Sequence, residues 1–203
     1  MSSTPGIDAA IERSGLVRDA FETARLAHAG QFRNGAEKIP YIDHPLAVAE
    51  RLAKHGFPDE VLAAALLHDV VEDSEMGVAE LRARFGDSVA DLVATMTEDE
   101  TIEDYEERKA EHRQRVAGAG AEALAIYAAD KLTNLAMLRD AYDTDGEAVG
   151  DQLKVPLDLK IAVWEADLDT LFERAADLSL VNEFADEMVG FWGDRVTDAP
   201  ASG

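Results

Sequence analysis

The sequence contains no cysteine. This excludes disulfide bonds and thiolate metal sites, so any metal ion must be held by His, Asp or Glu. No apolar run reaches the roughly 18 residues that suggest a membrane span. The N-terminus, "MSSTPGIDAA", lacks the basic start and the apolar stretch of a signal peptide. We therefore expect no membrane partner and, by default, a cytoplasmic location.

Basic residues are scarce. The chain has 19 Lys and Arg against 42 Asp and Glu, and its formal net charge is −23. A surface this acidic repels phosphate backbones, which argues against nucleic-acid binding. An anionic small-molecule substrate would need local positive charge in order to enter.

Strand patterns are also lacking, whereas apolar residues recur at helical spacing. With 203 residues and 47% hydrophobic content, the chain is predicted to form one all-α domain, a helical bundle, over residues 1–194, followed by a flexible tail at 195–203. Motifs occupy about 20–140, and closing helices about 152–193. The first three expected helices cover about 7–29, 45–55 and 57–73, and a loop, "GQFRNGAEKIP", separates the first two. Two short helices follow, with a break at Gly86 and with Asp87 or Ser88 as the cap of the second. The remaining segments are a polar exposed helix or flap over 98–115, a helix over 121–141, and one or two helices over 155–192.

The stretch "ALLHDVVEDSE" puts ionisable groups into an apolar helix. Residues four apart share a helix face, so His68 lies over Glu72, and Asp69 over Asp73. A carboxylate inside such a helix costs several kcal/mol unless it is paired or bound to a metal. The ordinary interpretation is a helix end that reaches water, with His68 as a hydrogen-bonded core histidine, but it must account for four groups at once.

Two further segments carry polar groups of the same kind. In "YAADKLTNLAML", Asp130 follows an apolar run and shares a helix face with Asn134, although Asp130 could simply pair with Lys131. In "PYIDHP", His44 stands between Asp43, a candidate helix N-cap, and a rigid proline. Imidazole and carboxylate ligands of this kind suit Mn²⁺, Fe²⁺ or Zn²⁺ and leave positions for water and substrate. The candidate metal ligands are His44, His68, Asp69 and Asp130.

These segments together resemble a known family. "AHAGQFRNG", "IPYIDHP", "AALLHDVVEDSE", "FGDSVADLV" and "ADKLTNL" occur in the order and spacing of the hydrolase domain of RelA/SpoT-type alarmone enzymes, which are HD-domain metal-dependent phosphohydrolases. The small stand-alone form is the most similar. The resemblance covers about Ala20 to Leu138. It implies an all-α bundle and a 3′-pyrophosphohydrolase of guanosine tetra- or pentaphosphate that releases pyrophosphate.

The resemblance also implies a role for each matching residue. One Mn²⁺ is bound by the four candidate ligands, while Glu72 and Asp73 position or activate the attacking water. A carboxylate held near a metal, but off it, can take the proton from a metal-bound water. The residues expected at the nucleotide are Arg33, Asn134, His28 close to the site, and Lys131.

Some positions depart from the family pattern. Asn34 stands where a lysine is expected, Glu100 closes a segment that often ends in lysine, and Ala136 stands near an expected arginine. Nearby cations could compensate, namely Arg33, Lys38, Arg108, Lys109 and Lys131. Two alternatives therefore stay open: an HD phosphohydrolase with another nucleotide or phosphoester substrate, and a metal-stabilised binding module without turnover. The sequence also leaves open whether Trp164, Phe172, Phe184 and Trp192 line the core or a homo-oligomer face.

Overall fold

The structure is a computed structural model that describes residues 6–33 and 39–198, with side chains described as far as Gly193. The expected all-α class is confirmed. Within the described ranges the only extended pairing is an isolated bridge between Phe32 and Pro40. The helices are α1 (Ile7–Arg13), α2 (Gly15–Ala27), α3 (Asp43–Lys54), α4 (Asp59–Leu67), α5 (Val70–Asp73), α6 (Val78–Phe85), α7 (Asp87–Met96), α8 (Tyr105–Gly118), α9 (Ala121–Asp145), the 3₁₀ helix η1 (Gly146–Gln152), α10 (Leu157–Ala175) and α11 (Ser179–Asp198).

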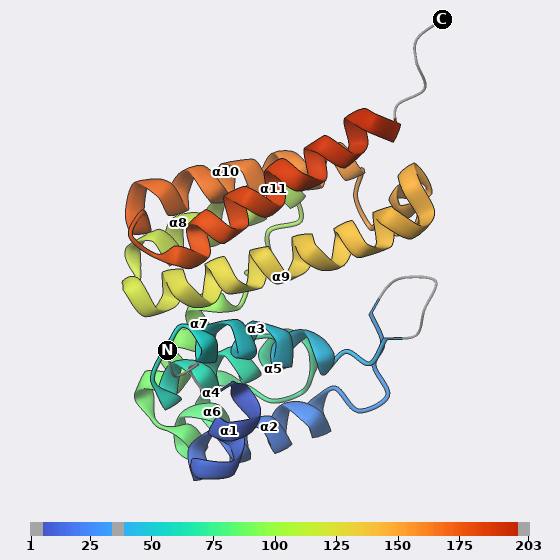
Figure 1. Ribbon diagram of the computed structural model, residues 1–203. Coiled ribbons are helices and arrows are strands. Elements are labelled where there is room, and N and C mark those ends of the chain that lie inside the picture. Colours follow the sequence, from blue (N-terminus) through green and yellow to red (C-terminus); the bar gives the residue numbers. More distant parts are fainter. Residues whose placement is uncertain (1–5, 34–38, 199–203) are drawn as a thin grey trace, which may run out of the picture.

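The helices form two layers (Figure 1). The N-terminal layer contains α1 to α7, and the C-terminal layer contains α8, α10 and α11. Helix α9 lies between them and packs on α3, α4 and α7 on one side and on α10 and α11 on the other. Any group that α9 carries toward the N-terminal layer is therefore shielded from solvent by both layers.

Helix α4 is the centre of the N-terminal layer. Every residue from Val61 to Leu67 is buried, and the helix packs on α2, α3 and α7. Burying a leucine side chain contributes roughly 1.5–3 kcal/mol. After its acidic first turn, Asp59 and Glu60, the helix has no solvent face, which is why the polar residues that follow its C-terminal end stand out.

Several helix ends differ from those expected. The 57–73 stretch is two helices, α4 and α5, with His68 and Asp69 between them. Helix α3 begins at Asp43, two residues before Pro45, and its N-cap is Ile42. The proposed N-cap role of Asp43 is therefore wrong, because the helix already includes that residue.

The capping of α7 also differs from the expectation. The break at Gly86 is confirmed, but neither Asp87 nor Ser88 caps α7; the N-cap is Gly86 itself, with no side-chain hydrogen bond. A φ of +85° at Gly86 is a conformation that side chains other than glycine's rarely adopt. The chain thus turns there by backbone geometry rather than by a side-chain cap.

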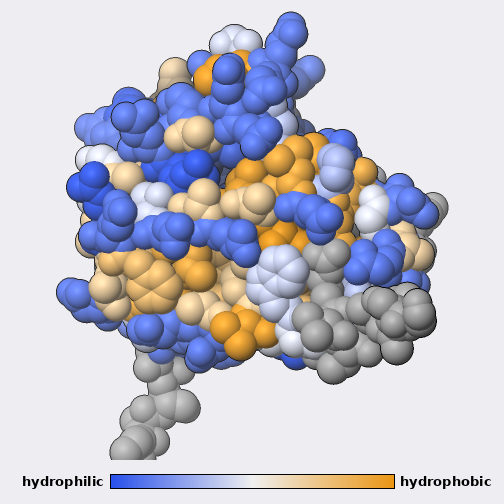
Figure 2. Space-filling model, turned by 90° about the horizontal axis from the view of Figure 1, so that it is seen from above, coloured by the Kyte–Doolittle hydropathy of each residue, from blue (hydrophilic) through white to orange (hydrophobic). Residues whose placement is uncertain are grey.

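The C-terminal region forms two closing helices. Helix α11 continues to Asp198, past the expected boundary at 194, and residues 199–203 lie outside the described part of the chain. Of the four aromatic residues in question, Trp164 and Phe184 are buried, whereas Phe172 is 42% and Trp192 39% exposed. Figure 2, seen from the α10–α11 side, shows hydrophobic residues exposed among charged ones. None of the described helices combines the length and apolarity that a membrane crossing requires.

Candidate metal centre

The break between α4 and α5 orients His68. Its Nδ1 lies 2.7 Å from the carbonyl oxygen of Ala65. Because a carbonyl only accepts hydrogen bonds, Nδ1 must carry the proton and donate it. The other nitrogen, Nε2, is buried and makes no hydrogen bond. A neutral His68 therefore presents the lone pair of Nε2 to the interior, the arrangement that metal-ligating histidines use.

The four candidate ligands come together from three segments. His44 is on α3, His68 and Asp69 lie at the α4–α5 junction, and Asp130 is on α9. One ligand atom from each of His44, His68 and Asp130 lies within 4.8 Å of the others, and all three residues are buried.

Short contacts connect the two imidazoles with the two carboxylates. His44 Nε2 is 3.0 Å from Asp130 Oδ1 and 3.7 Å from Asp69 Oδ2. His68 Nε2 is 3.1 Å from Asp69 Oδ1 and 3.7 Å from Asp130 Oδ1. The convergent atoms of His44, His68 and Asp130, with Asp69 in contact with both imidazoles, suit a divalent ion of the first transition row. The unbonded Nε2 of His68 within this group is a further sign of that fit.

The residues of the cluster have shifted pKa values, because each is buried beside charged groups. Burial lowers the pKa of His68, but the carboxylates of Asp69 and Asp130 outweigh it and raise that pKa to about 9. Burial also lowers the pKa of His44, and there it prevails. The pKa of Asp130 is held well below its usual value, because Lys131 and the two imidazoles outweigh the effect of burial.

Asp130 is fixed by its neighbours on α9. Lys131 Nζ donates to Asp130 Oδ2 at 2.8 Å, so the simple pairing of these two residues does occur. Asn134 Nδ2 donates to Asp130 Oδ1 at 2.7 Å. Arg33, from the loop before α3, donates in turn to Asn134 Oδ1 at 2.7 Å. Three of the four residues expected at the nucleotide thus connect to one candidate ligand.

Tyr41 is a site residue that sequence reasoning missed. Its hydroxyl donates to Asp69 Oδ2 at 2.8 Å, so it orients this carboxylate. Burial and the charge of Asp69 raise the pKa of the phenol, which stays protonated and remains a donor. The available signal was its place in "PYIDHP", three residues before His44.

His28 lies behind Tyr41 rather than in the metal cluster. Its ring stacks on the Tyr41 ring with centroids 4.7 Å apart, and its Nδ1 is 2.8 Å from Gln31 Oε1. Gln31 Nε2 donates to the backbone oxygen of Asp73 at 2.8 Å, which identifies the amide orientation. His28 therefore supports the segments that carry Tyr41 and Asp73, in keeping with its expected place close to the site.

The two expected water-handling carboxylates differ in environment. Glu72 is partly buried, and burial raises its pKa to about 7, although its Oε1 accepts a 2.6 Å hydrogen bond from the Glu98 backbone N–H. The pKa of Glu72 also responds to the charges of Asp69 and His68, which ties it to the cluster. Asp73 is exposed. A carboxyl with a pKa near neutrality is suited to proton transfer.

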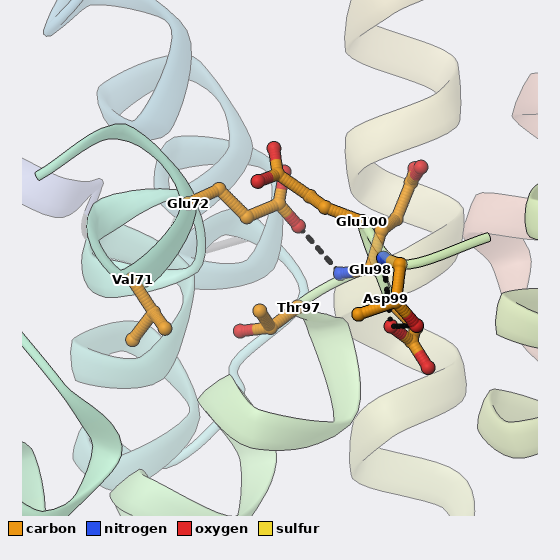
Figure 3. Close-up of a pocket in the computed structure, with 7 residues that line it drawn as sticks. Val71, Glu72, Thr97, Glu98, Asp99 and Glu100 are labelled. Carbon is orange, nitrogen blue, oxygen red and sulfur yellow. Dashed lines mark hydrogen bonds between the residues drawn. The ribbon is translucent and has the colours of Figure 1, made fainter. Parts of the chain in front are cut away.

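A cavity of about 330 Å³ opens beside Glu72. Figure 3 shows the Glu72–Glu98 hydrogen bond and the side chain of Glu100 extending toward Glu72. The cavity is acidic overall, so an anion would need cations from elsewhere. It is lined by Val71, Glu72, Thr97, Glu98, Asp99, Glu100 and Thr101.

Cations from α8 neutralise one wall of this cavity. Arg108 Nε lies 3.1 Å from Glu98 Oε2, and Lys109 Nζ pairs with Glu98 Oε1. Burial raises the pKa of Glu98, but Lys109, together with the charges of Lys131 and His112, holds it below its usual value. Two of the cations expected to compensate thus stand beside the cavity, but both are already paired with a carboxylate.

The positions that depart from the family pattern are spread around the site. Glu100 is exposed at the cavity wall, and Ala136 is half-buried on α9. Asn34 and Lys38 lie outside the described residues.

Comparison with known protein families identifies the family of the chain. The HD-domain family matches residues 20–154, and the chain belongs to this family. The match contains all four candidate ligands and both carboxylates expected to handle water, and it ends before α10 begins.

Several curated proteins with similar sequences are named as enzymes of guanosine nucleotide metabolism. The chain is 38% identical over 126 residues to the Xenopus tropicalis guanosine-3′,5′-bis(diphosphate) 3′-pyrophosphohydrolase MESH1, covering 61% of this chain and 70% of MESH1. It is 40% identical over 139 residues to a GTP pyrophosphokinase of Streptomyces coelicolor, covering 66% of this chain but only 16% of that protein. It is 33% identical over 154 residues to the Aquifex aeolicus 3′-pyrophosphohydrolase, covering 73% of this chain and 22% of that protein. The chain therefore spans only a small part of the long relatives.

Two solved structures share the fold. The structure reported as a metazoan SpoT orthologue that hydrolyses ppGpp superposes with a TM-score of 0.73 at 25% identity, covering 90% of this chain and 96% of that one. The lmo0812 protein of Listeria monocytogenes superposes with a TM-score of 0.68 at 37% identity, covering 74% and 99%.

Proposed function

We propose that the protein is a divalent-metal-dependent phosphohydrolase that cleaves guanosine 3′,5′-bis(diphosphate) at its 3′-diphosphate. Water adds to the phosphorus attached to the ribose 3′ oxygen, the bond between that oxygen and phosphorus breaks, and GDP and pyrophosphate leave. Residues 1–194 would act as one hydrolase domain. The observation that carries the proposal is the convergence of His44, His68, Asp69 and Asp130 beside a carboxyl whose pKa is about 7, that of Glu72.

The four convergent residues would hold the ion, with Mn²⁺ as the first choice and Fe²⁺ or Zn²⁺ as alternatives that the same ligands accept. When bound, such an ion polarises a phosphoryl group and lowers the pKa of a bound water. The Nδ1–H donated to Ala65 keeps His68 in the ligating tautomer, and the Tyr41 hydroxyl keeps Asp69 turned inward.

Carboxylates of the chain would accept the proton that the attacking water loses. Glu72 is positioned by the Glu98 backbone N–H, which bonds one of its oxygens and leaves the other free for water. A general base of this kind contributes typically 10²–10⁴-fold to the rate. Asp73 would accept a hydrogen bond from the same water, while Arg33 and Asn134 would contact the nucleotide.

The test is product analysis with purified, Mn²⁺-loaded protein and the tetraphosphate, with pyrophosphate and orthophosphate scored separately. Pyrophosphate should appear in step with GDP. The Glu72→Gln, Asp73→Asn double variant should lose at least about 100-fold in kcat while it still binds Mn²⁺. Absence of pyrophosphate from metal-loaded wild-type protein would refute the proposal. Wild-type turnover that survives the double variant would refute the role of the two carboxylates.

A second candidate is an HD phosphohydrolase with another nucleotide or phosphoester substrate. It is favoured by the acidic wall of the cavity, where Glu100 stands in place of a cation. Orthophosphate release across a panel of nucleotides and phosphomonoesters, with no pyrophosphate from the tetraphosphate, would select this candidate.

A further inference from the structure

Arg115 on α8 caps the C-terminal end of α7. Its Nη1 donates to the carbonyl oxygens of Ala94 at 3.0 Å, Thr95 at 3.2 Å and Thr97 at 2.7 Å. The last carbonyls of an α-helix have no donor within the helix, and a cation near that end is favourable. Arg115 is therefore a helix cap that a different helix supplies.

Glu111 holds the guanidinium of Arg115 in this position. The two residues are one turn apart on α8, and Nε and Nη2 of Arg115 lie 3.1 Å and 2.9 Å from the two carboxylate oxygens of Glu111. A bidentate pair of this kind fixes the orientation of a guanidinium as well as its distance. The remaining nitrogen, Nη1, is thereby directed at the end of α7.

The backbone N–H of Glu98 has two possible acceptors, and Arg115 occupies one of them. If α7 continued by one more turn, this N–H would donate to the carbonyl of Ala94, four residues earlier. Instead, Arg115 donates to that carbonyl, and the Glu98 N–H donates to Glu72 Oε1 at 2.6 Å (Figure 3). The cap thus ends α7 where the N–H of Glu98 can reach the carboxylate of Glu72.

The peptide group between Thr97 and Glu98 connects Arg115 with Glu72 directly. In a trans peptide the C=O and the N–H point in opposite directions. The C=O of this group accepts from Arg115 at 2.7 Å, while its N–H donates to Glu72. A cation on the carbonyl oxygen also polarises the group and strengthens its N–H as a donor. The direction and the strength of the hydrogen bond to Glu72 therefore both depend on Arg115.

Two further cations of α8 contact Glu98 in a different way. Arg108 and Lys109 pair with its side-chain carboxylate. Side-chain torsions separate that carboxylate from the backbone N–H, so these ion pairs do not fix the direction in which the N–H points. Arg115 bonds the peptide group itself.

Resting on the proposed function, we propose that Arg115 is a positioning residue for Glu72, the carboxylate that activates water, and that it acts through the Thr97–Glu98 peptide. Because Arg115 acts through the backbone, its loss should change how Glu72 is held and leave substrate binding to other residues.

Hydrogen exchange of the Glu98 amide, followed by NMR, measures this contact without turnover. In Arg115→Met, which removes the donors, the Glu98 amide should exchange about tenfold faster than in wild type, as expected for the loss of one hydrogen bond. Arg115→Lys restores a cation that can bond helix carbonyls and should stay within about threefold of wild type. The amide of Leu66, in the buried helix α4, reports overall stability, and the Glu98 rate is compared with it.

The pH profile of kcat is the readout on the tetraphosphate, with Mn²⁺ at saturation. Burial raises the pKa of Glu72 to about 7, and the hydrogen bond from the Glu98 N–H opposes that increase, while the charges of Asp69, Glu98 and His68 also act on it. Loss of the hydrogen bond in Arg115→Met should move the acidic limb of the profile up by about one pH unit and lower kcat at pH 6 about tenfold. KM, and kcat at pH 9, should stay within about twofold of wild type.

Arg82→Met is the matched control. Arg82 also contacts α7, but through the exposed side chains of Asp87 and Asp91 rather than through backbone carbonyls. Its replacement should leave both the Glu98 exchange rate and the pH profile unchanged. Arg115→Gln, which keeps a polar side chain, covers the case in which Arg115→Met does not fold, and it should produce both changes.

Two results would overturn the proposal. One is a Glu98 amide that, relative to Leu66, exchanges no faster in Arg115→Met than in wild type. The other is a kcat that falls equally at every pH, which a merely structural role of Arg115 would produce. If the Glu98 amide responds to Arg115 but the tetraphosphate is not hydrolysed by the wild-type protein, the positioning contact stands and the proposed function fails.

Discussion

His68 shows how one hydrogen bond orients a candidate metal ligand. With its proton on Nδ1 and bonded to Ala65, its Nε2 can bind a metal only when it is unprotonated. In the metal-free protein the carboxylates of Asp69 and Asp130 raise its pKa to about 9 against burial, so a proton occupies that nitrogen at neutral pH. Metal and proton therefore compete for the same lone pair.

Metal affinity should consequently depend on pH. Between about pH 6.5 and 9, Mn²⁺ affinity should rise by roughly tenfold per pH unit, because one proton leaves His68 on binding. Titrations at several pH values, in buffers of different ionisation enthalpy, measure both the slope and the proton released. In the metal-free protein the same raised pKa stabilises the fold fully below the unfolded value of 6.5, and this contribution is lost as the pH rises through 9. An affinity independent of pH would contradict the assignment.

Tyr41 would influence metal binding through Asp69, whose carboxylate it orients. Tyr41→Phe removes the 2.8 Å hydrogen bond to Asp69 Oδ2 and keeps the ring that stacks on His28. Loss of such a partner of a metal ligand typically costs 10–100-fold in metal affinity. We expect about a tenfold loss of Mn²⁺ affinity, measured by competition with a metal indicator. The control is Tyr142→Phe, which removes a 3.0 Å bond to Glu147 on the α9–η1 segment and should leave metal affinity unchanged.

The individual site residues could be predicted to different degrees. The sequence allowed His44, His68 and Asp130 to be predicted, because burying an imidazole or a carboxylate among apolar helix residues costs free energy unless the group is paired or binds a metal. Tyr41 was not found, since a phenol is unremarkable in sequence and matters here only through Asp69, which it meets after packing. Asp69 was predicted as a ligand, and the hydrogen bond that orients it was not.

At the scale of helices, the junction before α9 controls where Asp130 lies. Gly120 is the N-cap of α9, with φ +104° and ψ 177°, a region essentially restricted to glycine. Gly118, two residues earlier, is the last residue of α8 and has no such φ. Neither glycine has an atom within 4 Å of an added Cβ, so backbone strain is the main difference between the two positions.

Replacing these glycines should therefore have opposite effects. Gly120→Ala should lower the free energy of unfolding by about 1–3 kcal/mol because of backbone strain. Gly118→Ala should be neutral or stabilising by up to about 1 kcal/mol, because alanine favours the helix. Urea denaturation followed by circular dichroism measures both. Equal stability of the two variants would show that the turn before α9 relaxes without cost.

Helix positions were predictable, but their ends were less so. Apolar periodicity continues from Leu67 into Val70, so the sequence gives no sign of the interruption at His68 and Asp69. The spacing of apolar residues indicates which face of a helix is buried. The interruption between α4 and α5 follows instead from the contacts of His68 and Asp69 with residues of α3 and α9. The start of α3 at Asp43 rather than Pro45 has the same cause, since its N-cap, Ile42, packs against the core.

At the scale of the whole molecule, the excess of negative charge destabilises the folded state. A net charge of −23 on a chain with a pI near 4.4 repels itself in the folded state, and salt screens that repulsion. The midpoint of thermal unfolding should therefore rise between about 20 mM and 500 mM NaCl, where the screening length becomes much shorter than the molecule.

Lowering the pH provides the control for this effect. Near pH 5 the carboxylates begin to take up protons and the net charge falls, so the increase with salt should be smaller than at pH 8. Choline chloride should act like NaCl, because screening does not depend on the identity of the cation. An increase that occurs with only one of the two salts would indicate specific ion binding instead.

The arrangement of the ligands on α3, at the α4–α5 junction and on α9 has a consequence for the lifetime of the protein. These segments meet only when the two layers are packed, so an ion that binds them favours the folded chain by mass action. Removing the ion would increase the fraction of time for which α9 is detached, and proteases act on such open states. The supply of divalent metal would then govern both the activity of the protein and its abundance.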